Sequence, residues 1–228
     1  MGILIMKRML FLLALLAPIG AQAGAASDIA WTPEQLKFVK NGNINKGKEL
    51  AQTCGSCHGD TGQGMKEEQN EDVLIPAIPA LAGQVANYTY KQLRDYAKDQ
   101  RSHASMTGIA KGLSEQDAAD LAVWFSSLPL PKSSGSNSNL AKAEKMVAEG
   151  DGKRILPPCF VCHGANGQGE KMDIPALAGQ QADYFAKALL AYKSGERHND
   201  IYSRMRLIAQ QLSEAEIKEL AQYYQAFK

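Results

Sequence analysis

The 228-residue sequence predicts an all-α fold built from two similar domains in tandem, and three observations support this prediction. Capping residues precede stretches whose apolar side chains recur at helical spacing. Residues 78–99 match residues 174–195 at 12 of 22 positions, and both segments begin with Ile-Pro-Ala-Leu-Ala-Gly-Gln. A five-residue motif of cysteine and histidine also occurs once in each half. Two copies with one motif each indicate a duplicated domain rather than a solenoid.

The first 23 residues have the pattern of a secretory signal. Lys7 and Arg8 precede an apolar run that ends at Ile19, and Ala21-Gln22-Ala23 has the small-residue form of a cleavage site. We predict cleavage after Ala23 and an exported mature protein, with an uncleaved anchor as the alternative. The first cysteine, Cys54, lies too far from this position for a lipoprotein.

The overall composition argues against two classes of partner. Lys and Arg total 25 and Asp and Glu total 24, so no basic excess suggests binding to nucleic acid. No apolar run reaches the roughly 18–20 residues that a membrane-spanning helix needs.

The first domain is predicted over residues 24–131. Thr32 before Pro33 is typical of a helix start, because threonine caps free N–H groups and proline fits the first turn. The segments that follow are expected to be a helix at 45–53, a solvated acidic loop at 66–72, a helix at 87–98 and an irregular stretch at 101–111.

The last helix of this domain has the clearest signal. Ser114 and Asp117 have the spacing of a capping box, in which each side chain bonds the backbone N–H of the other. The expected buried residues of this helix are Ala118, Leu121, Ala122 and Phe125.

A stretch rich in Ser, Asn and Gly at residues 132–139 indicates a flexible linker. The second domain, residues 140–228, then repeats the pattern. A helix is expected at 140–149, and Ser213 with Glu216 forms a second capping box. The expected buried residues of the last helix are Ile217, Leu220, Ala221 and Tyr224.

The two motifs read Cys54-Gly55-Ser56-Cys57-His58 and Cys159-Phe160-Val161-Cys162-His163. Cys-x-x-Cys-His is the attachment signature of c-type haem. Two thiols one helical turn apart can add to two vinyl groups on one edge of the macrocycle, and the histidine then binds the iron. We therefore predict two covalent haem c groups, attached through Cys54, Cys57, Cys159 and Cys162 and ligated by His58 and His163.

Two other uses of these cysteines are weaker. A four-ligand zinc site usually takes a second cysteine pair nearby, whereas the histidines of the two motifs are 163 − 58 = 105 residues apart. A redox-active dithiol needs a βαβ context and no following histidine, and neither motif is surrounded by a strand pattern.

Each iron needs a sixth ligand far enough along the chain to reach its opposite face. Met106 follows His58 by 48 residues and Met205 follows His163 by 42 residues. Each methionine is followed by Ile-Ala and then Leu-Ser at the same spacings, so they occupy one slot of the repeat. We predict that Met106 and Met205 are the ligands. The alternative is that both only fill gaps in the core.

Four other residues are weaker candidates for the sixth ligand. Met65 and Met172 lie too close to the motif histidines to reach the far face. His103 and His198 are rivals to the methionines, but they do not occupy equivalent slots, and both are expected at the surface.

Other repeat-equivalent residues suggest contacts around each haem. A ligating histidine usually donates its second N–H to a carbonyl, and the prolines after each motif either accept this bond or only shape the loop. A tyrosine and an arginine of each half either bind haem propionates or serve packing. These residues are Pro79 and Pro175, Tyr88 and Tyr184, and Arg101 and Arg197.

These motifs resemble a known family. Each half is similar to a class I cytochrome c domain, and residues 30–228 resemble the cytochrome c4 family in their Ile-Pro-Ala-Leu-Ala-Gly-Gln segments and Arg…Met…Ile-Ala…Leu-Ser runs. The first half has an acidic loop after its motif that the second half lacks, so the two halves are unequal.

The resemblance implies a periplasmic dihaem electron carrier rather than an enzyme. It implies two haems near a pseudo-twofold interface, a monomer that is soluble or peripherally attached to the membrane, and electron flow from quinol-oxidising complexes to a terminal oxidase, often of the cbb3 type. Two alternatives remain: a cytochrome subunit of a periplasmic dehydrogenase, and a dihaem redox enzyme such as a peroxidase or a thiosulfate-oxidising cytochrome.

Overall fold

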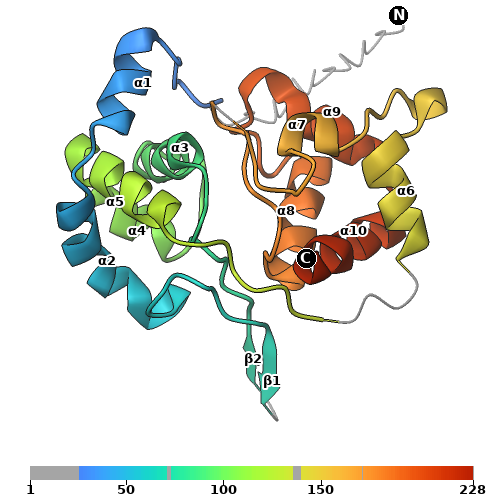
Figure 1. Ribbon diagram of the computed structural model, residues 1–228, viewed down its shortest axis with the longest axis horizontal. Coiled ribbons are helices and arrows are strands. Elements are labelled where there is room, and N and C mark those ends of the chain that lie inside the picture. The colour runs from blue at the N-terminus through green and yellow to red at the C-terminus, as the bar shows by residue number, and fades with distance from the viewer. Residues whose placement is uncertain (1–25, 71–72, 136–139, 171, 228) are drawn as a thin grey trace, which may run out of the picture.

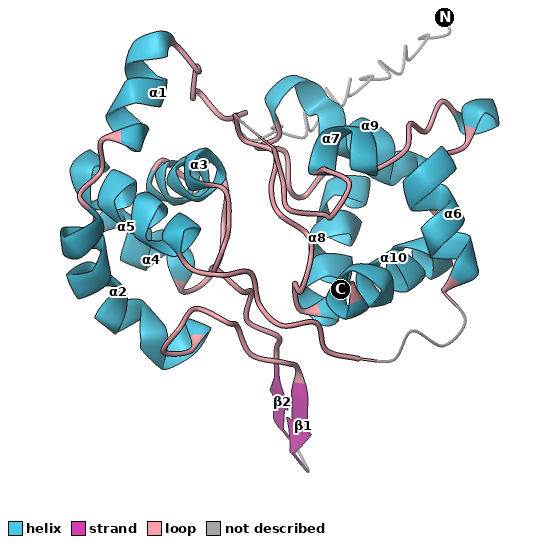
Figure 2. Ribbon diagram, viewed as in Figure 1, coloured by secondary structure: helices cyan, strands magenta, loops and turns pink. Residues whose placement is uncertain are grey.

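The structure, a computed structural model, describes residues 26–70, 73–135, 140–170 and 172–227. The predicted signal segment and residues 136–139 of the predicted linker lie outside the described residues. Two helical halves lie side by side, and a narrow two-stranded hairpin projects away from them (Figure 1). Figure 2 shows that loop segments run between the two halves.

The first half contains five helices and the hairpin among its described residues. In chain order they are α1 (Pro33–Lys40), α2 (Ile44–His58), β1 (Glu68–Asn70), β2 (Val73–Ile75), α3 (Ala86–Ala97), α4 (Met106–Lys111) and α5 (Glu115–Ser127).

The second half consists of helices alone over its described residues. In chain order they are α6 (Ala141–Glu149), the short 3-10 helix η1 (Gly152–Arg154), α7 (Phe160–His163), α8 (Ala182–Ser194), η2 (Ile201–Ser203), α9 (Arg204–Gln211) and α10 (Glu214–Ala226). None of the helices described here is long and apolar enough to span a bilayer.

The predicted helix starts are confirmed. Thr32 caps α1 by accepting a hydrogen bond from the backbone N–H of Gln35. Complete capping boxes begin α5 and α10, at Ser114 and Ser213. All eight residues that the sequence assigns to the buried faces of these two last helices are buried.

The two cores are organised around these last helices. In the first half α5 packs against α2 and α3, and in the second half α10 packs against α8 and α6. At the crossing of α2 and α5 the backbones come so close that a Cβ on Gly47 would lie 2.0 Å from the carbonyl oxygen of Asp120. Glycine at this position therefore sets the distance between the two helices.

Two predicted irregular segments are ordered instead. The end of the stretch 101–111 forms helix α4, which begins at Met106. The acidic run 66–72, expected as a loop, contributes strand β1, which pairs with β2 in antiparallel register. Met65 and Ile78 exchange two backbone hydrogen bonds of 2.9 Å at the base of the hairpin, and this closure brings the two arms together.

Helix α2 also extends further than predicted. It continues from the expected range through the whole first motif and ends at His58. Part of the predicted linker is hydrogen-bonded to the second half, because the backbone N–H of Ser134 donates to the carbonyl of Gln225 near the end of α10.

A buried polar network joins the two halves. On α3, the ammonium of Lys91 pairs with the Asp95 carboxylate at 2.5 Å and also donates to the backbone carbonyl of Asn199. The Asn199 side chain in turn donates to Asp95 and to Gln92. Because these groups are buried and satisfied by one another, separating the halves would expose or orphan each of them.

Candidate haem sites

Both motifs end a helix at the histidine. His58 is the last residue of α2 and His163 is the last of α7. The glycines that follow, Gly59 and Gly164, have φ values of 81° and 84°, a conformation that glycine adopts without strain and that turns the chain sharply. The carbonyl of each histidine then accepts a 2.8 Å hydrogen bond from the N–H of the glycine six residues on.

The histidine rings are oriented in the same way in both halves. Nδ1 of His58 lies 2.8 Å from the carbonyl oxygen of Pro79, and Nδ1 of His163 lies 3.0 Å from that of Pro175. Both histidines are buried. Burial lowers the pKa of each imidazole, while the proline carbonyl opposes the change. A neutral ring that donates from Nδ1 presents the Nε2 lone pair to a metal.

The cysteines of each motif differ in exposure. Cys54 and Cys159 are partly buried, Cys57 and Cys162 are exposed, and all four are free thiols. Burial raises the pKa of Cys54, and it raises that of Cys159 to about 11. Within the described parts of the chain, no group of three or more His, Cys, Asp or Glu side chains could hold a metal ion. The two free thiols and the buried histidine of each motif fit haem attachment.

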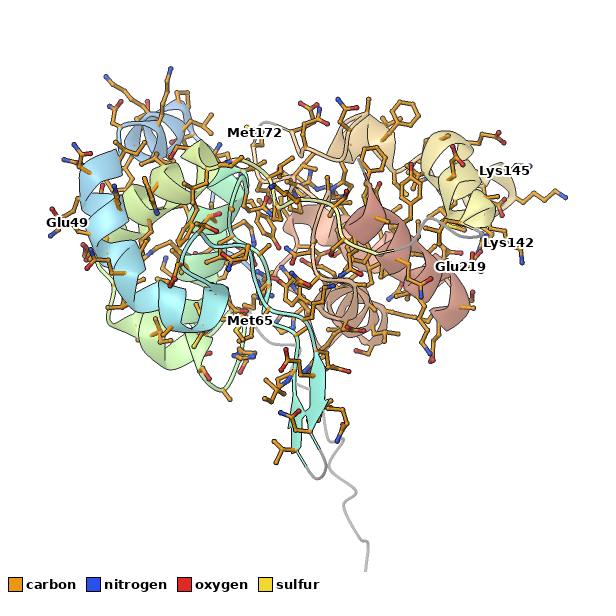
Figure 3. The ribbon with its side chains drawn as sticks, turned by 60° about the horizontal axis from the view of Figure 1, so that its bottom comes forward. Glu49, Met65, Lys142, Lys145, Met172 and Glu219 are labelled. Atoms are coloured by element: carbon orange, nitrogen blue, oxygen red, sulfur yellow. The ribbon has the colours of Figure 1, made fainter. Side chains whose placement is uncertain are left out.

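The candidate methionine ligands lie at equivalent places. Met106 is the first residue of α4 and Met205 is the second residue of α9, and both are half-buried. Met65 and Met172, labelled in Figure 3, are 40% and 39% exposed. Met106 and Met205 are thus less exposed than Met65 and Met172, and their assignment as ligands stays a prediction.

The rival histidines behave differently from each other. His103 is exposed, as expected, and its Nδ1 lies 3.4 Å from the backbone N of Met106, at the start of α4. His198 is half-buried rather than exposed, and its Nε2 is buried without a hydrogen-bond partner among the described residues. The expectation that both are surface histidines is therefore wrong for His198.

The tyrosines and arginines of the repeat bond across the boundary between the halves. Arg101 donates to the Tyr184 hydroxyl, and Arg197 donates to the Tyr88 hydroxyl, each at 3.1 Å. Burial alone would raise the pKa of Tyr184, but the two guanidinium groups lower it to about 8. Neither arginine pairs with a carboxylate in the described parts of the chain, so positive charge gathers at the interface.

Two glutamines near the sites were missed from the sequence. Gln84 and Gln180 are the last residues of the two copies of the repeated heptapeptide. Gln84 forms hydrogen bonds with Ala176 of the second copy, and Gln180 forms them with Ala80 of the first copy. The exact repetition of the heptapeptide was the available signal, but it does not reveal that the partners are exchanged between halves.

Comparisons with known proteins agree with this geometry. The family model "Cytochrome c" matches residues 44–129 and 150–227. The chain is 33% identical to cytochrome c4 of Pseudomonas aeruginosa, over 81% of this chain and 88% of the relative. It is 32% identical to the "Thiosulfate dehydrogenase electron acceptor" of Stutzerimonas stutzeri, over 90% of this chain and 91% of that protein.

A solved structure shows the same arrangement. The crystal structure of reduced recombinant cytochrome c4 from Pseudomonas stutzeri matches with a TM-score of 0.72 and 33% identity, and the match covers 82% of this chain and 100% of that one. The two motifs therefore correspond to two haem c groups, and the chain is similar to dihaem electron carriers. With two cytochrome c domains in one chain and these relatives, the protein belongs to the cytochrome c4 family of dihaem class I c-type cytochromes.

Proposed function

We propose that this chain is a periplasmic carrier that accepts electrons from a quinol-oxidising complex and delivers them to a terminal oxidase. The observation that carries the proposal is the repeat of one site in both halves. Each half holds a buried histidine fixed by a proline carbonyl and a half-buried methionine in the same slot. Two like sites in halves that contact each other suit a relay of single electrons.

In this proposal Cys54, Cys57, Cys159 and Cys162 attach the two haems, and four residues bind the irons. His58 and His163 supply the proximal nitrogens, and Met106 and Met205 supply the sixth ligands. The bound group supplies the one-electron couple of its iron. A thioether opposite an imidazole favours the reduced state and raises the potential. With a histidine and a methionine from the chain as its two ligands, each iron would have no position open to a substrate.

The interface arginines have a role in the same proposal. Arg101 and Arg197 bring two positive charges to the boundary between the halves without a carboxylate partner in the described parts of the chain. Haem propionates are anions, and arginine matches carboxylate geometry well. We assign these arginines to charge compensation of the propionates, in addition to their tyrosine contacts.

The test is electron transfer by the purified dihaem protein. Mixed with a solubilised quinol:cytochrome c oxidoreductase and quinol, both haems should become reduced, and a cbb3-type oxidase should reoxidise them. Failure of either half-reaction would contradict the proposed route. Intact-mass analysis of the secreted protein should show a chain that begins near Gly24 and carries two haems. A chain that keeps its first 23 residues would contradict the predicted cleavage.

A second candidate is an electron acceptor for a dehydrogenase. It is favoured by the relatives named "Thiosulfate dehydrogenase electron acceptor" in Stutzerimonas stutzeri and Thiomonas intermedia. A solved thiosulfate dehydrogenase from Marichromatium purpuratum also matches with a TM-score of 0.70 and 27% identity, although the match covers only 40% of that chain. Rapid reduction by a thiosulfate dehydrogenase with thiosulfate, together with slow reduction by the quinol-oxidising complex, would favour this candidate.

An enzyme with an open haem is the contrasting possibility. Closed His/Met sites do not bind carbon monoxide readily, so the reduced protein should keep its visible spectrum under that gas. Formation of a carbon monoxide complex at one haem would favour a peroxidase-like or thiosulfate-oxidising enzyme instead.

A further inference from the structure

Gln84 and Gln180 are buried, and each makes a two-bond contact with the other half. Oε1 of Gln180 accepts from the N–H of Ala80 at 2.8 Å, and its Nε2 donates to the carbonyl of Ala80 at 3.1 Å. Gln84 makes the same two bonds to Ala176, at 2.8 and 3.1 Å. Each Oε1 also accepts a 2.9 Å bond from the backbone N–H of the residue that follows its own glutamine.

The bonded alanine N–H groups belong to the peptide units that hold the histidines. The carbonyl of Pro79 and the N–H of Ala80 form one amide, and this carbonyl lies 2.8 Å from Nδ1 of His58. An amide is a conjugated unit, so an acceptor on its N–H makes its oxygen more negative, and hydrogen bonds in such a chain strengthen one another. A continuous path therefore runs from Gln180 through this amide to His58.

We propose that Gln84 and Gln180 are positioning residues that lower the redox potential of the haem in the opposite half. The acceptor oxygen of Gln180 polarises the Pro79–Ala80 amide, and this amide then draws harder on the Nδ1 proton of His58. A more electron-rich imidazole stabilises ferric iron. By the same path, Gln84 acts on His163 through the Pro175–Ala176 amide. The inference rests on the proposed role of these histidines as iron ligands.

The same interface contains a matched control. Gln181 is also buried and also crosses between the halves, where its Nε2 donates to the carbonyl of Gln63 at 3.1 Å. This contact is to the Gln63–Gly64 amide, whose N–H bonds the backbone carbonyl of His58 and not the histidine ring. Its repeat equivalent in the first half is Val85, so the position already accepts an apolar side chain in one copy.

The experiment is a potentiometric titration of the dihaem protein with Gln180→Met, Gln84→Met and Gln181→Met, with each haem assigned by NMR. Gln180→Met should raise the potential of the Cys54/Cys57 haem. We expect about a threefold change in its reduction equilibrium, or about 28 mV at about 59 mV per tenfold. Gln84→Met should do the same to the Cys159/Cys162 haem. Gln181→Met should shift neither.

The pattern of shifts separates tuning from packing. A loss of packing would move the haem of the mutated half, or both haems together, and either result would overturn the inference. Should Gln180→Met fail to fold, Gln180→Asn withdraws the acceptor from Ala80 by one methylene and should shift the same haem in the same direction. An unchanged potential there would also overturn it.

Failure of the proposed function has a different signature. If His58 or His163 were not a ligand, the unmodified protein would lack a low-spin His/Met spectrum at that haem. A normal spectrum with no crossed shift in the variants would contradict only the role of the glutamines.

Discussion

Met106 and Met205 can be tested as ligands one at a time. Replacement of either by alanine removes the thioether, so one ferric haem should lose its methionine-to-iron near-infrared band. The potential of that haem should also fall, because the thioether that favours ferrous iron is gone. We expect each single variant to lose about half of the band intensity, since each removes one of two ligands. Absorption of the ferric protein measures this directly.

Two further variants serve as controls for the methionines. Met172→Ala changes an exposed methionine and should leave the full band. His198→Ala tests the half-buried rival whose Nε2 has no partner among the described residues. A spectrum that changes with His198→Ala and not with Met205→Ala would replace the methionine by this histidine as the ligand of the second iron.

Contacts within one half were easier to predict from the sequence than contacts between the two halves. The bonds of His58 and His163 to Pro79 and Pro175 span 21 and 12 residues within one half, and chemistry alone suggested them. The glutamine contacts span 92 and 100 residues. Nothing in a repeat distinguishes a contact within one copy from the same contact exchanged between copies, and so both glutamines were missed.

Helix α2 should be intolerant of any side chain at Gly47. A Cβ there would lie 2.0 Å from the Asp120 carbonyl oxygen on α5. Gly47→Ala should therefore push the helices apart and reduce the free energy of unfolding by about 1–3 kcal/mol, the usual range for overpacking. Guanidinium titration followed by far-ultraviolet circular dichroism measures the change.

Gly108 provides the matched control for Gly47. It also lies in a helix, but a Cβ added there would meet nothing within 4 Å. Gly108→Ala should be neutral or stabilise by about 0.5–1 kcal/mol, because alanine loses less backbone freedom on folding. Equal destabilisation by the two variants would contradict the close approach of α2 and α5.

The start of α10 should make the second half sensitive to acid. Arg154 holds the Glu216 carboxylate with two hydrogen bonds of 2.8 and 3.0 Å and lowers its pKa from 4.5 to about 2. Since the folded pKa is the lower one, the stabilisation is complete above about pH 4.5 and is lost as pH falls toward 2. Glu216→Gln should reduce the free energy of unfolding by about 1–2 kcal/mol at pH 7 and by progressively less below pH 4.5.

Asp117 is the equivalent residue of the first half and serves as the control. It completes the capping box of α5 with Ser114, and it has no arginine partner among the residues that the structure describes. Asp117→Asn should therefore have the smaller effect at pH 7. A constant difference between Glu216→Gln and the unmodified protein from pH 7 to pH 2 would show that Arg154 contributes nothing through the carboxylate charge.

Side-chain caps gave a local start signal for three of the predicted helices, whereas α4 and the hairpin had no such signal and were missed. α1, α5 and α10 begin at side chains that cap them. α4 begins at Met106, and the side chain of its N-cap residue Ser105 makes no capping bond, so the sequence there gives no signal of a helix start. The hairpin depends on the bridge between Met65 and Ile78. The sequence of two short exposed strands does not predict this contact.

At the scale of the molecule, the two halves differ in charge. Residues 27–131 carry 10 Lys and Arg against 13 Asp and Glu, a net of −3, and residues 132–228 carry 13 against 11, a net of +2. Positive charge near an iron disfavours the ferric state. Such surface charges are worth on the order of 1 kcal/mol after screening, or roughly 40 mV for one electron. The Cys159/Cys162 haem should therefore have the higher potential.

The structure limits the size of this difference. Arg204 and Arg206 flank Met205, but Arg204 pairs with Asp173 at 3.0 Å and Arg206 with Asp200 at 2.8 Å. These carboxylates offset the local positive charge, so the net charge of each half carries the effect and roughly 40 mV is an upper value. A potentiometric titration with assigned haems checks the order. A higher potential at the Cys54/Cys57 haem would show that burial and propionate contacts outweigh charge.

The exchanged glutamine and arginine contacts have the geometry of an isologous dimer folded into one polypeptide. In such an interface residue i of one copy meets residue j of the other, and j meets i. The covalent connection between the halves is then not what holds the two copies together. A chain opened there, with both haems attached, should stay associated as two complementary fragments. A single copy produced alone should expose a self-complementary face and pair with itself.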